Sequence, residues 1–161
     1  MIKRKVFKLL ILALLCLLLV GCARSEYKYT STDDGVTISE YTGSDTNLVV
    51  PEEYESIAVT IIDYNTYAYN IYIQNVILSK NIKIIKGCSF WYCTELSSVY
   101  VPKGLEIIEE YAFYNCPKLV NIYFEDSEAN INIDVRNHND AFNDAKKHYD
   151  VSLSDYKNYL K

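Results

Sequence analysis

The feature of this sequence that most constrains its fold is an internal repeat of 23 residues. The stretch GCSFWYCTELSSVYVP at 87–102 is followed by EYAFYNCPKLVNIYF at 110–124, which repeats its aromatic, cysteine and apolar positions. The aligned pairs are Phe90 and Phe113, Cys93 and Cys116, Leu96 and Leu119, Val99 and Ile122, and Val101 and Phe124. A period in the twenties is typical of a solenoid, in which each coil can bury its apolar side only against its neighbours.

The same offset continues upstream to about residue 59, and the strand LVVP at 48–51 joins the pattern after a five-residue insertion. We therefore predict an α/β repeat solenoid of about three coils, with a short parallel β-sheet, over residues 36–125. Because side chains alternate along a strand, every second strand residue should point inward and stack from coil to coil. The predicted inward rows are Leu48, Val76, Val99 and Ile122, and Val50, Leu78, Val101 and Phe124.

The segments on either side of the repeat are expected to cap the solenoid. Upstream, YKYTSTDDGVTISEY alternates around an Asp-Asp-Gly turn and predicts a β-hairpin. Downstream, residues 126–161 leave the repeat and become polar. A helix from Asp140 to Tyr149, with Asn139 at its start, and a second short helix capped by Ser152 or Ser154 are expected there, as a C-terminal helical cap on the last coil.

The repeat resembles the BspA-type leucine-rich repeat of bacterial surface proteins. The third coil, SVYVPKGLEIIEEYAFYNCPKL at 98–119, has the family's order of strand, proline, Ile-rich segment, Ala-Phe, cysteine and leucine. The coil before it has Ser79 in place of the proline and Ser89 in place of the alanine. The resemblance implies a non-enzymatic, cell-surface module for protein–protein binding or adhesion.

The repeated cysteines are interpreted as part of the coil rather than as a reactive site. Cys93 and Cys116 align with Asn70 in the first coil, and both residue types can donate a hydrogen bond to a backbone carbonyl at a tight bend. This predicts a ladder of buried donors. A Cys93–Cys116 disulfide is an open alternative, because coils about 4.8 Å apart lie within its distance range. Cys88 and Cys93 have no second pair, so no metal site is expected.

The N-terminus has the features of a signal peptide. A basic start, MIKRKVFK, precedes the apolar run LLILALLCLLLV at 9–20, which is shorter than the roughly 20 residues that span a bilayer. Leu19-Val20-Gly21-Cys22 resembles the lipobox of bacterial lipoproteins, which implies cleavage after Gly21 and lipidation of Cys22. An ordinary secretory signal that ends in cysteine is the alternative.

These patterns divide the chain into four parts and place it in a bacterial cell envelope. We expect a signal peptide at 1–21, a lipidated cysteine, tether and hairpin start at 22–35, the repeat domain at 36–125 and the C-terminal cap at 126–161. The protein would be held by its lipid on the extracytoplasmic side of the membrane, since several acyl chains together give stable anchoring.

Charge and motif content argue against several function classes. Removal of residues 1–21 takes away 4 of 16 basic side chains and leaves 12 against 21 acidic ones, a formal charge of −9, which disfavours nucleic acid. No nucleophile elbow, phosphate loop or zinc motif is present, so no catalytic residue, cofactor or metal is expected. Asp144 and His148 could form half of an acid–base or metal site, but a solvated pair on one helix face is favoured.

The candidate binding surface is the outward row of the sheet. Alternation places Val49, Ile77, Tyr100 and Tyr123 side by side on the face opposite the core. A protein or peptide ligand is the expected partner, bound through this row. Two alternatives remain open. The tyrosines could serve only to stabilise the sheet, and the protein could be a structural envelope lipoprotein that scaffolds another component.

Overall fold

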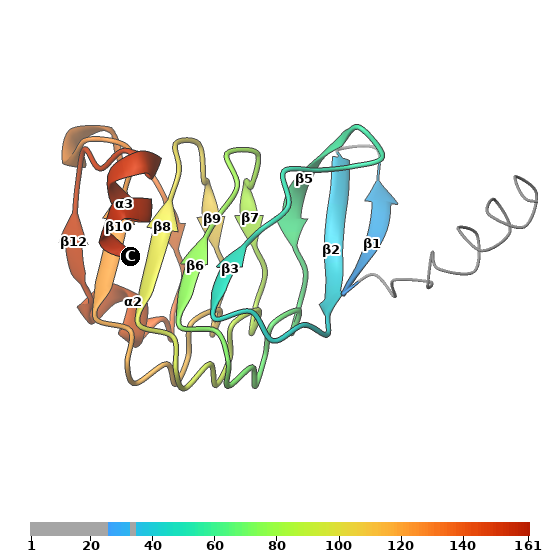
Figure 1. The fold of residues 1–161 in the computed structure, drawn as a ribbon, viewed down its shortest axis with the longest axis horizontal. Coiled ribbons are helices and arrows are strands. Elements are labelled where there is room, and N and C mark those ends of the chain that lie inside the picture. The colour runs from blue at the N-terminus through green and yellow to red at the C-terminus, as the bar shows by residue number, and fades with distance from the viewer. Residues whose placement is uncertain (1–25, 33–34) are drawn as a thin grey trace, which may run out of the picture.

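The computed structural model describes residues 26–32 and 35–161, which form a solenoid with two sheets facing each other across a common core (Figure 1). The first sheet is parallel and has five strands in the order β12-β10-β8-β6-β3. They are β3 (Asn47–Val49), β6 (Asn75–Ile77), β8 (Ser98–Val101), β10 (Asn121–Phe124) and β12 (Lys146–His148). We call it the front sheet, because it faces the viewer in Figure 1.

The second sheet, called the back sheet, runs in the order β1-β2-β5-β7-β9-β11. Its strands are β1 (Tyr27–Thr32), β2 (Gly35–Tyr41), β5 (Ile57–Ile62), β7 (Ile84–Ile85), β9 (Ile107–Ile108) and β11 (Asp134–Val135), and β4 (Glu53–Tyr54) pairs with β5 in antiparallel fashion. All neighbours from β2 to β11 pair in parallel. Each successive coil therefore adds one strand to each sheet.

The solenoid and its parallel sheet are confirmed, but the predicted number of three coils is wrong, since the chain makes about five turns. The missed turns lie at the two ends of the array, where β2 belongs to the back sheet and β12 follows β10 after a step longer than 23 residues. Asn75, Ser98 and Asn121 pair in register at the regular 23-residue offset. The step from Asn47 to Asn75 is longer, and so is the step from Asn121 to Lys146. Strand pairing tolerates these insertions because the extra residues lie between the paired strands of the front sheet, and those after β3 include β4, which pairs with β5.

The core consists of the two inward rows that the alternation predicted. All eight predicted members are at most 3% exposed, and Leu48, Val76, Val99 and Ile122 are fully buried. Strand β8 ends directly before Pro102, which has no backbone N–H to continue the ladder. The buried residues of successive coils form one continuous cluster.

A column of aromatic rings runs through this core between the sheets. Phe90 and Phe113 are fully buried and their rings are stacked and nearly parallel, with centroids 5.0 Å apart. The column continues at 4.8 Å to Tyr67 on one side and at 5.2 Å to Phe142 on the other. Such stacked pairs add stabilisation beyond the burial of apolar area.

The C-terminal segment differs from its prediction as a helical cap. It contains η1 (Glu128–Asn130), α2 (Asp140–Asp144) and α3 (Leu153–Tyr159), but also strands of both sheets. The helix expected from Asp140 to Tyr149 ends at Asp144, because residues 146–148 pair with β10 instead. Helix α3 is capped by Ser152, whose Oγ accepts from the backbone N–H of Asp155 at 3.1 Å, and the helix lies on the front sheet (Figure 1).

At the other end, β1 and β2 pair as the antiparallel hairpin that the sequence indicates. Since β2 also pairs in parallel with β5, it is the first strand of the back sheet and not a separate cap. The signal-peptide and lipobox predictions, including Gly21 and Cys22, lie outside the described residues. Within 26–32 and 35–161, no helix has the length and apolar character needed to cross a bilayer.

The aromatic column predicts a cooperative loss of stability. Replacing Phe113 by Ala removes a fully buried ring that stacks on two neighbours, and should lower the free energy of unfolding by about 3–5 kcal/mol. Val120→Ala, at a side chain that is 56% exposed, should change it by less than about 0.5 kcal/mol. Denaturant unfolding measures both. A local effect confined to one coil, with the global transition unchanged, would contradict the stacked arrangement.

A second prediction concerns alkaline pH. Burial raises the pKa of the Tyr100 and Tyr156 phenols from 10.0, and that of the Cys116 thiol from 9.0, to about 12. The unfolded chain loses these protons first, so between the two pKa values it binds fewer protons than the folded chain. The contribution of these three groups to the free energy of unfolding should therefore be constant below about pH 8.5 and fall progressively above about pH 9. Denaturant titrations at several pH values in this range measure the free energy of unfolding. Its slope against pH should not be positive.

Candidate functional site

The predicted binding row is in register on the outer face of the front sheet, but most of it is covered. Strand pairing places Val49, Ile77, Tyr100 and Tyr123 in one line across four strands. Val49 is 54% exposed, whereas the other three side chains are at most 8% exposed. The expectation of an open row is therefore wrong for three of its four members.

Helix α3 is what covers them. Tyr156 is fully buried between Tyr100 and Tyr123, with ring centroids 5.4 and 5.0 Å away. Its hydroxyl lies 2.6 Å from Ser98 Oγ. Leu153 and Leu160 pack beside it against the same cluster. The spacing of Leu153, Tyr156 and Leu160 is that of one apolar helix face, and this is the signal that could have revealed the cover from sequence.

His148 does not form the acid–base pair with Asp144 that was considered. Its ring stacks on Tyr123 at 4.5 Å, and its Nε2 lies 2.9 Å from Asn121 Oδ1. Burial and the nearby Lys146 lower the pKa of His148 below 6.5, which favours the neutral ring. Across residues 26–32 and 35–161, no cluster of three or more His, Cys, Asp or Glu side chains could hold a metal ion.

The residues of the predicted ladder each donate to the coil before them. Cys93 Sγ donates to Tyr67 O at 3.2 Å, Cys116 Sγ donates to Phe90 O at 3.1 Å, and Asn70 Nδ2 donates to Gly43 O at 3.2 Å. Both thiols are free and buried. Burial raises the pKa of Cys93 well above 9.0, so the thiol stays protonated at neutral pH and is a poor nucleophile.

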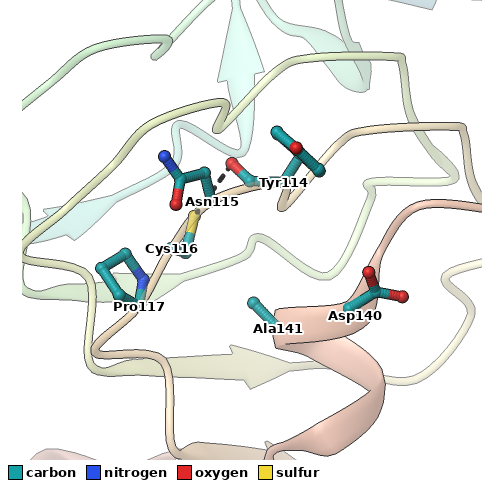
Figure 2. Close-up of a pocket in the computed structure, with 6 residues that line it drawn as sticks. All are labelled: Tyr114, Asn115, Cys116, Pro117, Asp140 and Ala141. Carbon is teal, nitrogen blue, oxygen red and sulfur yellow. Dashed lines mark hydrogen bonds between the residues drawn. The ribbon is translucent and has the colours of Figure 1, made fainter.

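A shallow pocket beside α2 includes Cys116 (Figure 2). It is lined by residues 114–117 of the preceding loop and by Asp140 and Ala141 of the helix, and its volume is about 240 Å³. Because burial raises the pKa of the Cys116 thiol to about 12, the pocket contains no reactive thiolate near neutral pH. The pocket is therefore better suited to contact with another molecule than to catalysis by the Cys116 thiol.

A second group of exposed or half-buried rings lies along the loops that join the back sheet to the front sheet. We call it the aromatic edge, and its members are Tyr69, Trp91, Tyr92, Tyr111, Tyr114 and His138. Ring contacts run without a break from one end to the other. The centroid distances are 5.3 Å for Tyr69–Trp91, 5.4 Å for Tyr69–Tyr92, 6.4 Å for Tyr92–Tyr114, 5.6 Å for Tyr111–Tyr114 and 4.4 Å for Tyr111–His138.

The backbone of the aromatic edge is strained at repeated positions. Tyr69, Tyr92 and Asn115 occupy the same position in successive coils, with φ of 59°, 57° and 54°. Asn tolerates this left-handed conformation, whereas a tyrosine there costs on the order of 1 kcal/mol. Two coils thus have a tyrosine at this position, although Asn115 in the next coil shows that asparagine can occupy it. Retained strain of this kind favours a role for the side chain itself.

Structure comparison shows the same fold in several bacterial proteins. A leucine-rich repeat protein from Bacteroides capillosus aligns with a TM-score of 0.62 at 23% identity, over 77% of this chain and 93% of that one. The T. pallidum leucine-rich repeat protein aligns with a TM-score of 0.61 at 20% identity, over 78% and 63%. A leucine rich cell surface protein from Faecalibacterium prausnitzii aligns with a TM-score of 0.55 at 22% identity, over 64% and 32%.

The chain thus spans less than two thirds of the T. pallidum and F. prausnitzii structures. No curated protein matches it significantly. The family model described as BspA type leucine rich repeat region (6 copies) matches residues 40–159, which is most of the sequence and includes the strands beyond residue 125. This chain therefore belongs to the BspA-type leucine-rich repeat family.

Proposed function

We propose that the protein is a non-enzymatic binding module, lipid-anchored in a bacterial envelope, that contacts a protein partner through its aromatic edge. The repeat family is consistent with protein interaction. The front sheet, where binding was first expected, is largely closed by α3. The proposal therefore moves the contact from the sheet to the loops.

The observation that carries this proposal is the unbroken row of rings at the surface. Tyr69 is 60% exposed, and Tyr111 and Tyr114 are 37% and 38% exposed. Tyrosine and tryptophan are enriched in protein interfaces and in their energetic hot spots, because each offers a large contact area at a low cost in side-chain entropy. Since the edge runs across successive coils and their turns hold it in place, it is preorganised for contact.

The size of the solenoid limits the kind of partner. About five coils present an edge far shorter than that of long repeat arrays, whereas stable protein interfaces bury about 800 Å² on each side. The edge suits a compact patch or a loop of a partner protein. Adhesion to a neighbouring cell or a host surface would then depend on many copies in one membrane, since multivalency raises the overall avidity.

The proposed location rests on the Leu19-Val20-Gly21-Cys22 sequence. A lipid on Cys22 would leave only a few residues before β1, so the solenoid would lie close to the membrane. The F. prausnitzii protein with the same fold is described as a cell surface protein, which supports an envelope location.

Site-directed photocrosslinking in cells tests the aromatic edge. Benzoylphenylalanine at position 114 should yield a discrete adduct with a partner, whereas the same group at Ile57, which is 47% exposed on the back sheet, should not. Adding Tyr92→Asn should weaken the complex by about 10-fold or more if the edge is a hot spot. The same change relieves the left-handed tyrosine but removes its ring contacts, so the free energy of unfolding should change by less than about 1 kcal/mol.

Two outcomes would overturn the proposal. Equal adducts at positions 57 and 114 would indicate contact without a specific face. A partner retained in full by Tyr92→Asn would indicate that the tyrosines serve only the fold, as a structural envelope lipoprotein requires.

The anchor makes its own prediction. Cells grown with an alkyne fatty acid should label the parent protein, and Cys22→Ser should abolish that label and release the protein from the membrane fraction. Because one sulfur atom carries the proposed attachment, the loss should be complete and not graded. A variant with Cys16→Ser, also within the signal region, serves as control and should label normally. Membrane retention of Cys22→Ser would instead favour an uncleaved signal.

A further inference from the structure

The outer face of the front sheet retains one pocket beside α3. It has a volume of about 200 Å³ and lies over the strands β3, β6 and β8, next to the part of the face that Tyr156 fills. Its apolar wall comes from Val49, Ile77, Leu78, Pro102 and Leu153. Pockets for whole small molecules usually measure about 300–1,000 Å³, so this one suits a single side chain.

Two of the residues that line this pocket carry a buried hydroxyl group with no hydrogen-bond partner within the described chain. The hydroxyl groups are Tyr100 Oη and Ser79 Oγ, and their side chains are 1% and 5% exposed. A buried hydroxyl without a partner lowers stability by about 1–3 kcal/mol, so most buried hydroxyls in folded proteins are paired. Two such groups beside one pocket make it a candidate site for a bound group that would satisfy them.

The charged groups at the pocket balance one another. Glu52 and Lys80 form an ion pair at 2.8 Å, Glu125 Oε2 accepts from the backbone N–H of Lys103 at 3.2 Å, and Lys157 adds a positive charge from α3. Glu125 lies near enough to Tyr100 to disfavour its phenolate electrostatically. An anionic ligand at the Tyr100 hydroxyl would meet the same repulsion, so a neutral group with both a donor and an acceptor fits best.

We propose that this pocket binds one apolar residue of an extended peptide segment from a protein partner. The residue's side chain lies against the apolar wall, and its peptide carbonyl accepts hydrogen bonds from the Tyr100 and Ser79 hydroxyls. A peptide N–H can donate to the free oxygen of Glu125. This site lies on the sheet face and involves no member of the aromatic edge, so either site can fail without the other.

Amide NMR of the full-length protein in detergent tests this site with defined probes. N-acetyl-leucine and N-acetyl-phenylalanine N-methylamides should shift amide signals of residues 77–80 and 153–157, with saturation near about 1 mM as expected for fragments of this size. N-acetylglycine N-methylamide, which lacks a side chain, should bind at least about 10-fold more weakly.

The matched variants are Tyr100→Phe and Ser79→Ala, which each remove one hydroxyl and keep the remaining shape. Each change should weaken binding of the leucine probe by about 3- to 10-fold. Each should also leave the midpoint of thermal unfolding unchanged or raise it, because an unpaired buried hydroxyl is removed. Tyr92→Asn, at the aromatic edge, should leave probe binding unchanged.

Three results would overturn the inference. Equal shifts by the glycine probe would show that no side chain is recognised. Undiminished binding by both hydroxyl variants would show that water alone satisfies these groups. Stronger binding of methyl glucoside than of any amide would assign the pocket to a carbohydrate.

Discussion

The stacking of inward side chains between successive coils is the interaction on which the rest of this structure depends. No coil can bury Val99 or Phe113 by itself, because a single turn has no second layer. Burial becomes complete only where the coils above and below supply Val76, Ile122, Phe90 and Phe142. The hydrogen-bonded ladders of the two sheets then hold the coils at one spacing, and that spacing sets where every loop side chain lies. Surface features such as the aromatic edge are consequences of the core repeat.

The core could be predicted from the sequence because its signal repeats. Alternation and the 23-residue offset together identified all eight members of the inward rows and both phenylalanines, and a repeated signal is hard to produce by chance. The coil count failed at the two ends of the array, where β12 follows β10 after a longer step and where β2, expected in a hairpin cap, belongs to the back sheet. Asn139 precedes the first residue of α2, as predicted, but its side chain has a second role that the sequence did not reveal. Its Oδ1 accepts from Phe113 N at 2.9 Å and its Nδ2 donates to Glu109 O at 2.8 Å.

Asn139 thereby does for the fourth coil what hydroxyl groups do earlier. Thr66 Oγ1 donates to Ile38 O at 3.0 Å, and Ser89 Oγ donates to Asp63 O at 2.9 Å, each closing a turn onto the coil before it. These residues share a position and not a chemical type, and a longer loop displaces Asn139 from the regular register of the repeat. Alignment of the repeats compares residue types at a fixed offset of 23 residues. It therefore detects Thr66 and Ser89 as equivalent positions and misses Asn139. The cover by α3 has a different origin. Leu153, Tyr156 and Leu160 form one apolar helix face that the sequence contains, but this spacing does not by itself show which surface the helix packs against.

The cover by α3 explains why the outer face of the front sheet is not the open binding surface that the sequence predicts. Without a cover, the outer face of the front sheet would expose the apolar side chains of Ile77, Tyr100 and Tyr123 to water. Tyr100 and Tyr123 are buried by Tyr156 of the same chain, which converts this exposed apolar area into core. The gain is incomplete at Val49 and at the pocket beside Leu153, where two hydroxyls stay unpaired. Val49, this pocket and the left-handed tyrosines of the aromatic edge are the positions at which the structure is less stable than it could be. Proteins usually retain such local losses where function requires them, so these positions are the natural places to look for bound partners.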